Sequence, residues 1–221
     1  MNNLSYRSAG KTSIISGIFG ILAFGILWAG LLMRGGTSAD HSGDIMFRTH
    51  DAGVILQYLF MIHVVFAMYA ISQRQSVQMN KTILYIGIGA LMFTILFLLL
   101  GSFKILMDTD YMIPQGVFGL WLIVVCKNKS VVFPRGLRRL GRIVGVGLIL
   151  VGTFPIAFNI FVDPIGFVGT LPDNYVDKDT PANSMVHLIL LIGSFMGVAI
   201  LPIWSILLGR KFLRSDSSTN G

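Results

Sequence analysis

Residues 52–72 read AGVILQYLFMIHVVFAMYAIS and contain no Asp, Glu, Lys or Arg. An α-helix rises about 1.5 Å per residue and the hydrocarbon core of a bilayer is about 30 Å thick, so roughly 20 apolar residues cross it. Backbone N–H and C=O groups find no water in lipid, and a helix satisfies them within the segment. The stretch therefore predicts a membrane-spanning helix that carries one imidazole, His63, near its middle.

The rest of the chain repeats this pattern. Apolar residues make up 54% of the sequence and charged residues 12%, and the mean hydropathy of +0.75 is far from that of a soluble domain. Further spans are predicted at 12–33, 82–101, 140–163 and 185–208, with a shorter one at 111–126. The sequence predicts an all-α integral membrane bundle of six transmembrane helices, forming a single domain over 1–221 with a flexible polar tail at 209–221.

Charge predicts the orientation of this bundle. With six spans, the N-terminus, the loops 73–81 and 127–139 and the C-terminal tail share one side, which carries 13 of the 17 basic residues. Nine of the ten acidic residues lie on the other side. Short cytoplasmic loops of membrane proteins are enriched in Lys and Arg. We therefore expect cytoplasmic N- and C-termini and a location in the cell membrane, meaning the plasma or inner membrane.

The formal net charge of +7 has an explanation in the bilayer itself. The basic residues lie in short loops beside helix ends, where they meet anionic lipid headgroups. The lipid bilayer is therefore the expected partner, and nucleic acid is not expected. The stretch KNKSVVFPRGLRRLGR at 127–142 is also suited to a phosphoinositide or an acidic partner, although nothing in it requires one.

Small residues recur four positions apart within the spans. Such pairs allow two helix backbones to approach closely. We expect them to pack helices within one chain rather than between chains; the pairs are Ser16 and Gly20, Gly141 and Gly145, and Gly193 and Gly197. Pro155 and Pro202 lie inside the last two spans, where each removes a backbone donor and is expected to bend its helix.

Polar residues gather in the outer third of the predicted bundle. They come from four spans: His50, Asp51, Gln57, Tyr111, Gln115, Asn159, Asp163 and His187. Polar side chains within a membrane usually face protein or a water-filled space. The sequence therefore suggests a polar vestibule as a hypothesis, while simple contact between these residues and headgroup water is the favoured interpretation. The candidate ligand-binding residues are His50, Asp51, His63, Asn159, Asp163 and His187.

His63 is predicted to lie roughly 16 Å inside its span, near the bilayer centre. Its ring needs a polar partner there, and Thr94 and Ser194 are candidates on neighbouring spans. The favoured interpretation is a packing histidine that bonds across helices. A proton relay, a haem ligand and a substrate contact remain the alternatives.

The spacing of the histidines and aspartates gives little support for a haem or metal site. His63 and His187 differ in predicted depth by roughly 12 Å, whereas two axial ligands of one iron need the same level. The segments DHSGD at 40–44 and RTHD at 48–51 supply His and Asp but match no ordered metal motif. The chain has no Glu, and Cys126 is its single cysteine. No metal site and no cofactor are predicted.

Two segments resemble a known group of proteins. These are LWLIVVCKNKSVVFPRGLRRLGRIVGVGLILVG at 120–152 and FRTHDAGVILQYLFMIHVVFAMYAI at 47–71. They are similar to the fourth-to-fifth span region and the second span of uncharacterised six-span prokaryotic membrane proteins, grouped as domains of unknown function. The resemblance implies the six-helix architecture and assigns no activity.

Two classes of function are compatible with these features. The first is a non-catalytic bundle that binds or transports a small or lipidic ligand, or serves as an accessory subunit beside another membrane subunit. The second is a membrane-embedded enzyme or redox protein that uses His63, His187 and the outer Asp residues. The first is favoured, because the sequence shows no catalytic spacing such as GxSxG, Walker A or HExxH.

Overall fold

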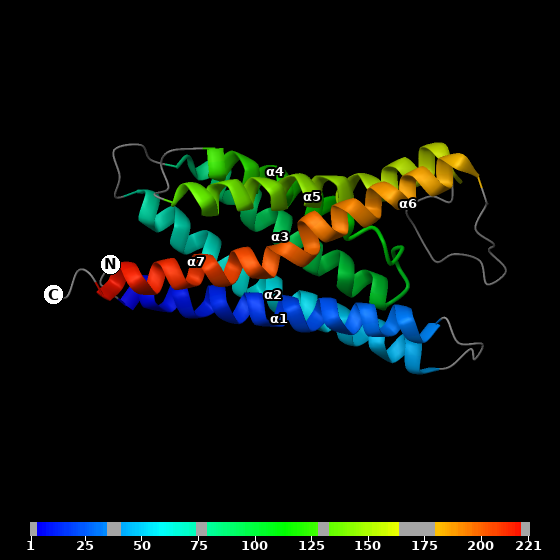
Figure 1. Ribbon diagram of the computed structural model, residues 1–221, viewed down its shortest axis with the longest axis horizontal. Helices are drawn as coiled ribbons and strands as arrows, with labels where there is room; N and C mark the ends of the chain where they lie inside the picture. The colour runs from blue at the N-terminus through cyan, green and yellow to red at the C-terminus, as the bar shows by residue number, and fades with distance from the viewer. Residues whose placement is uncertain (1–3, 35–40, 74–78, 128–132, 164–179, 218–221) are drawn as a thin grey trace.

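The computed structural model describes residues 4–34, 41–73, 79–127, 133–163 and 180–217, and Figure 1 shows them as an elongated helical bundle. The elements are α1 (Leu4–Arg34), α2 (His41–Ser72), α3 (Lys81–Ser102), α4 (Met112–Lys127), α5 (Arg135–Phe161), α6 (Pro181–Gly193), the π-helical turn η1 (Ser194–Ala199) and α7 (Ile200–Ser217). Because α6, η1 and α7 run on without a break, the chain forms six helical segments. The prediction of an all-α bundle is confirmed.

Five of these segments are long and apolar enough to cross a membrane. They are 6–32, 45–72, 81–102, 135–161 and 181–214. The sixth, α4, has 16 residues and is shorter than the roughly 20 that a full crossing needs. The helices also extend beyond the predicted spans, and α7 continues to Ser217, so the predicted start of the tail at residue 209 lies inside a helix.

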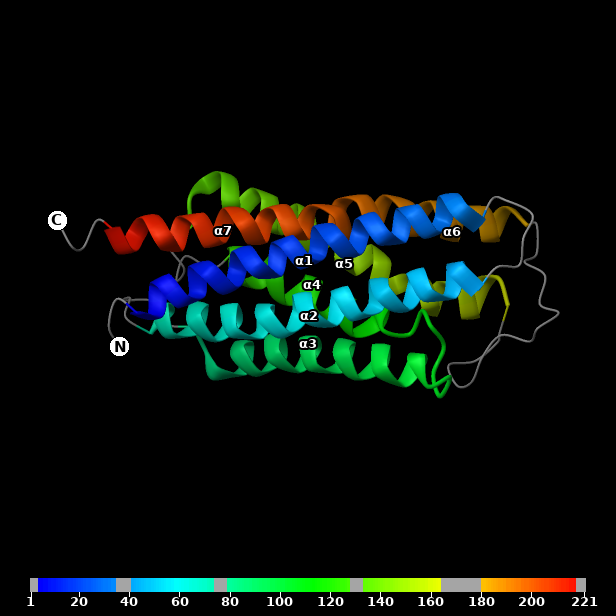
Figure 2. The ribbon, with the colours of Figure 1, turned by 90° about the horizontal axis from the view of Figure 1, so that it is seen from below.

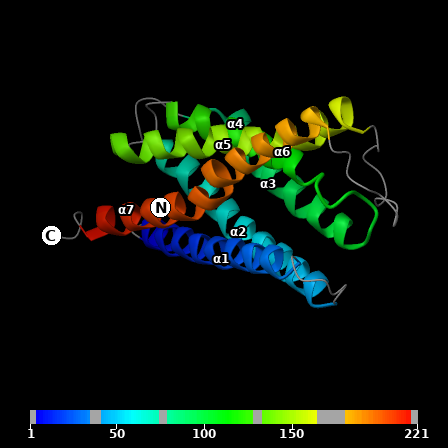
Figure 3. The ribbon, with the colours of Figure 1, turned by 45° about the vertical axis from the view of Figure 1, so that its right-hand side comes forward.

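Each helix packs against the next one along the chain, and α7 packs against α1 to close a ring. Figures 1 and 2 show the start of α1 and the end of α7 at the same end of the bundle, which we call the terminal end. Towards the opposite end, α6 diverges from α1, as Figures 1 and 3 show. The last segment of the chain therefore lies farther from α1 at the opposite end than at the terminal end (Figures 1 and 3).

Glycines bring the helices of this ring into close contact. A Cβ on Gly116 of α4 would lie 2.9 Å from Gly152 Cα of α5, and one on Gly145 would lie 2.7 Å from Gly119 O. Gly147 of α5 meets Gly197 of η1 at still closer range. These approaches are too short for any side chain. The predicted packing of small residues within one chain is confirmed.

Side-chain hydrogen bonds also join neighbouring helices. Ser13 and Ser205 donate to each other's carbonyl oxygens at 2.7 Å, which ties α1 to α7. Trp121 Nε1 donates to Ile83 O at 2.7 Å, and Trp204 Nε1 donates to Leu137 O at 3.2 Å. Interhelical hydrogen bonds in a membrane contribute about 0.6 kcal/mol each. These bonds fix the positions of the helices along one another, because apolar contact alone does not define a single register.

The π-helical turn η1 precedes Pro202 of α7. A proline inside a helix has no N–H, and its ring crowds the carbonyl four residues earlier, here that of Val198. A wider turn relieves that crowding, and such turns often occur at functional sites. Pro202 packs closely against Gly20 of α1, where an added Cβ would lie 2.6 Å from the proline Cγ.

Candidate functional site

A cavity of about 630 Å³ lies inside the ring, on the side of the bundle opposite the terminal end. We call it the opposite-end cavity. Its walls come from α1, α2, the turn before α4, α4, α5, α6, η1 and the start of α7. Most of the lining is apolar, including Phe24, Trp28, Leu191 and Phe195. Binding pockets for small molecules have this character, with volumes of about 300–1,000 Å³ and a few convergent polar groups.

The polar lining contains five of the eight residues predicted for the vestibule. These are His50, Gln57, Tyr111, Gln115 and His187, and the structure adds Tyr58, Ser184 and Ser194. The predicted gathering of polar side chains from several helices therefore corresponds to one cavity. Whether these residues bind a ligand stays a prediction.

Gln115 of α4 forms the most constrained polar contact of the cavity. It is 3% exposed, and its Nε2 donates to the hydroxyl of Tyr58 on α2. Its Oε1 has no hydrogen-bond partner among the described residues. Rotating the amide by half a turn would only exchange the two atoms, because the Tyr58 hydroxyl reaches one of them. One buried polar atom of Gln115 therefore lacks a hydrogen-bond partner beside the cavity that the residue lines.

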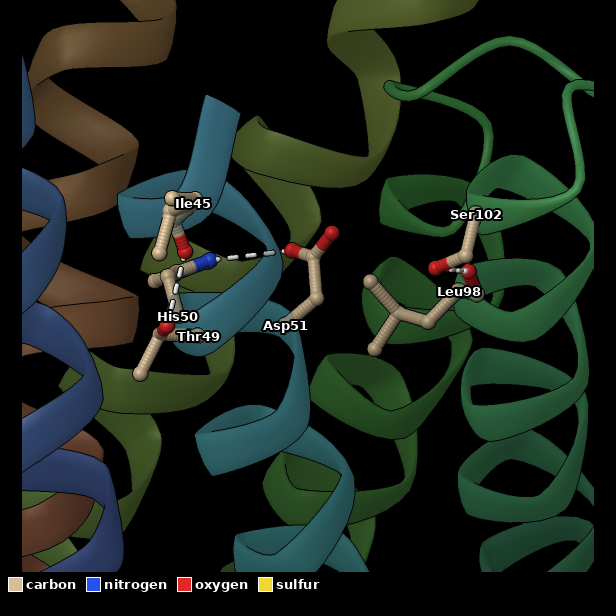
Figure 4. A network of polar contacts seen from close by, with 6 residues as sticks. All are labelled: Ile45, Thr49, His50, Asp51, Leu98 and Ser102. Atoms are coloured by element: carbon tan, nitrogen blue, oxygen red, sulfur yellow. Dashed lines mark hydrogen bonds and ion pairs between the residues drawn. The ribbon is translucent and has the colours of Figure 1, made fainter. Parts of the chain in front are cut away.

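His50 lies on α2 at the same level of the bundle. Its Nδ1 is 3.0 Å from Asp51 Oδ1, as Figure 4 shows. A carboxylate only accepts hydrogen bonds, so Nδ1 carries a proton, and in the neutral imidazole Nε2 is an acceptor. His50 is 4% exposed and lines the cavity, whereas Asp51 stands behind it and orients the ring.

His187 contributes a second oriented imidazole from α6. Its Nδ1 is 3.0 Å from the backbone oxygen of Asn183, which accepts the hydrogen bond. The ring packs edge-on against Phe154 and Phe158, with centroid separations of 5.5 and 6.3 Å. His50 and His187 therefore place imidazole rings on two walls of one cavity, in a mostly apolar lining.

Asn159 and Asp163, also predicted as candidates, do not line the cavity. They lie at the end of α5, where Asn159 Nδ2 donates to Pro155 O at 3.0 Å. That bond holds the Asn159 amide against its own helix. The opposite-end cavity therefore does not bring these two residues together with His50 and His187, and any part they play in binding stays a prediction.

His63 contacts a polar side chain of another helix, as predicted, but the partner differs from the two candidates. It is exposed on the outer face of α2, and its Nε2 lies 3.3 Å from Ser8 Oγ near the start of α1. Thr94 instead donates to Ala90 O of its own helix, and Ser194 lines the cavity. The favoured interpretation, a histidine that bonds across helices, is therefore supported, with Ser8 of α1 as the partner in place of Thr94 or Ser194. The depth of His63 near the bilayer centre stays a prediction. His63 and His187 are not brought together.

The turn before α4 contains a buried carboxyl, Asp110. It is 2% exposed; Oδ2 accepts a hydrogen bond from Met107 N at 3.2 Å, and Oδ1 has no partner among the described residues. Burial raises the pKa of this carboxyl, and the Met107 N–H opposes that shift. Asp110 precedes Tyr111, which lines the cavity, so it supports the lining without facing it.

The described residues contain no cluster of three or more His, Cys or Asp side chains that could hold a metal ion. The side chains of His41 and Asp44, together with Asp40, lie outside the part of the chain whose placement is described. The interpretation of segment 40–44 therefore stays a prediction. Cys126 is buried at the end of α4.

Tyr58, Ser184 and Ser194 were missed because a sequence does not show which face of a helix is turned inward. Tyr58 counts as apolar in a hydropathy pattern, and Ser194 reaches the cavity from the π-helical turn. One signal was available on α1: Phe24, Leu27, Trp28 and Leu31 follow the i, i+3, i+4, i+7 spacing of one helix face, and all line the cavity. In an all-apolar span, however, such spacing does not distinguish a cavity wall from a lipid-facing wall.

Comparisons of the chain with protein families, with curated proteins and with solved structures find no match. The resemblance of residues 47–71 and 120–152 to uncharacterised six-span proteins therefore stays a prediction. The function rests on the geometry of the bundle and its cavity.

Proposed function

We propose that the protein is a six-span protein of the plasma or inner membrane with both termini in the cytoplasm. The five long apolar helices and the shorter α4 supply six crossings, and the shared position of the two ends requires an even number. Six of the basic residues at the terminal end are Lys11, Lys127, Arg135, Arg138, Arg210 and Arg214, which favours the cytoplasmic side. The short α4 crosses by local thinning of the bilayer.

The opposite-end cavity binds an amphipathic molecule with one apolar chain and a hydrogen-bonding head. The observation that carries this proposal is the unpartnered Gln115 Oε1 in an apolar cavity of about 630 Å³. Gln115 Oε1 is an acceptor, and so is Nε2 of a neutral His50, so the head group must supply donors such as hydroxyls. A monoacylglycerol has this chemistry.

Access to the cavity comes from the side of the bundle. Leu31 on α1 and Leu188, Leu191 and Phe195 on α6 and η1 line the cavity and are also exposed on the outer surface. These are the two walls that diverge in Figure 1. An apolar chain that already lies in the bilayer can reach the cavity between them without crossing water.

Trp28 provides a direct test, because it lines the cavity and the other two tryptophans do not. Purified protein is titrated with a monoacylglycerol brominated on its chain, since bromine quenches tryptophan on contact. We expect saturable quenching that disappears in Trp28→Phe. Quenching that rises without saturation, or that persists in Trp28→Phe, would contradict binding in the cavity.

Gln115→Leu tests the polar end of the same site. It removes the free acceptor at similar size, and a net hydrogen bond contributes roughly 1 kcal/mol, so binding should weaken about fivefold to tenfold. The control is Thr94→Val on α3, which alters a buried polar residue that bonds within its own helix and does not line the cavity. Equal affinities for all three proteins would show that Gln115 is not part of the site.

A further inference from the structure

A second cavity of about 490 Å³ lies between the start of α5 and the end of α7. Leu137, Leu140 and Leu207 form its apolar wall, and Arg210, Lys211 and Arg214 form its basic side. We call it the basic cleft. It shares no lining residue with the opposite-end cavity, because its walls belong to the terminal end of the bundle.

The start of α5 adds to the positive character of the cleft. Pro134 is the residue before the helix, and its side chain does not cap the first turn. The first amide groups of a helix lack intrahelical acceptors and carry the positive end of its dipole, which favours anions. Gly136 lines the cleft, and a Cβ added there would meet nothing within 4 Å. The backbone at this point is therefore open to a ligand.

The elements around the cleft carry mostly one sign of charge. Besides the three basic residues of α7, the start of α5 bears Arg135, Arg138 and Arg139. The only acidic residue in α7 is Asp216, at its penultimate position. The chemistry that complements this set is an anionic group with an apolar extension, because the basic side continues directly into a leucine wall.

We propose that the basic cleft binds an anionic phospholipid of the leaflet that meets the terminal end. The phosphate group lies between the start of α5 and the side chains of Arg210, Lys211 and Arg214. One acyl chain lies along Leu137, Leu140 and Leu207. The position suits a headgroup, since α7 changes from apolar to basic within one turn, from Leu207 to Arg210. This is a defined site, distinct from general attraction between basic loops and an anionic surface.

Native mass spectrometry of delipidated protein in detergent tests this site. Phosphatidylglycerol and phosphatidylcholine with identical chains are added separately, and bound lipid is counted. We expect one phosphatidylglycerol to stay bound preferentially. Arg210→Gln combined with Arg214→Gln should weaken it roughly thirtyfold, since each basic residue near an anionic headgroup contributes about a fivefold factor.

Two further variants separate a defined site from general electrostatics. Gly136→Leu leaves every charge in place and fills the cleft, and the open space at Gly136 lets the fold accept it, so binding should also be lost. Arg135→Gln combined with Arg139→Gln removes the same charge from exposed positions that do not line the cleft, and it should weaken binding much less. Equal losses in the two arginine pairs, or full binding in Gly136→Leu, would overturn the proposal. Displacement of the lipid by equimolar inorganic phosphate would also overturn it, by showing that the acyl chain contributes nothing.

Discussion

His63 interrupts the apolar run of residues 52–72, and its surroundings define a limited role. Its ring is exposed on α2, and the contact that the structure gives it is the 3.3 Å approach to Ser8 Oγ. The contact joins α2 to the first turns of α1. It lies away from the opposite-end cavity, to which the histidines His50 and His187 belong.

His63→Ala should therefore have a small structural effect and no effect on ligand binding. We expect the free energy of unfolding to fall by about 0.6 kcal/mol, the usual contribution of one interhelical hydrogen bond in a membrane. Quenching of Trp28 by the brominated monoacylglycerol should match that of the wild type. A variant that unfolds normally but loses quenching would show that His63 acts on the cavity.

Asp110 predicts a dependence of stability on pH. Burial raises its pKa in the folded protein above the ordinary value of 3.8, so the folded state holds the proton more tightly than the unfolded state. The contribution of this group is most favourable below pH 3.8 and is lost as pH rises through the folded pKa. When Asp110 is ionised, its carboxylate is buried, and one of its oxygens has no partner among the described residues.

Asp110→Asn should remove that penalty. The amide oxygen can still accept the Met107 N–H, and no charge is buried. We expect a higher melting temperature than the wild type at about pH 7 and a smaller difference between the two near pH 4, measured by thermal unfolding in detergent. A lower melting temperature for Asp110→Asn at neutral pH would mean that the ionised carboxylate stabilises the fold.

At the scale of elements, the close contact between α5 and η1 fixes the position of the last helical segment. Gly147 and Gly197 bring the two backbones together at a distance that admits no side chain. η1 also turns Ser194, Phe195 and Val198 into the cavity. Close packing at Gly147 therefore links the fold of the last segment to the shape of the cavity wall.

Gly147→Ala should destabilise the protein by about 1–3 kcal/mol, the usual cost of inserting a methyl group into a closely packed interface. The matched control is Gly89→Ala on α3, where an added Cβ meets nothing within 4 Å. That variant should unfold at or slightly above the wild-type temperature, since Ala is the better helix former. Similar melting temperatures for the two variants would contradict the proposed packing role of Gly147.

The elements also show what the sequence could predict. Long apolar runs predicted the number and order of the helices, and small residues at 141, 145, 193 and 197 predicted close packing, because both features are local. The faces of the helices could not be predicted, since lipid and protein interior are equally apolar surroundings. That is why Tyr58 and Ser194 were missed, and why Asn159 and Asp163 were grouped with residues of a cavity that they do not line.

At the scale of the whole molecule, the charge asymmetry predicts the orientation in the membrane. Cysteine labelling tests it in cells, with little background from Cys126, which is 2% exposed. Asp173→Cys lies in the predicted outer loop and should react with a membrane-impermeant maleimide in intact cells. Ser218→Cys, in the predicted cytoplasmic tail, should react only after permeabilisation. Labelling of both from the same side would contradict a single crossing between the two positions, and with it the proposed topology.

The two cavities differ in the chemistry of their linings and lie at opposite ends of the molecule. The opposite-end cavity is apolar with a few acceptors, and the basic cleft at the terminal end is apolar with cations. The first suits a neutral head group with donors, and the second suits a phosphate. Both open beside leucine walls, so both are suited to ligands that reach the protein through the bilayer.

Photolabelling in reconstituted membranes tests the central claim most directly. A monoacylglycerol with a diazirine on its chain is crosslinked to the protein, and labelled peptides are mapped by mass spectrometry with and without excess unlabelled monoacylglycerol. The cavity account predicts that labelling of residues 24–31 and 184–198 is abolished by the competitor, while labelling of the exposed face of α3 around Tyr85, Met92 and Phe93 is not. Labelling that responds equally to the competitor at both places would contradict a binding site in the opposite-end cavity.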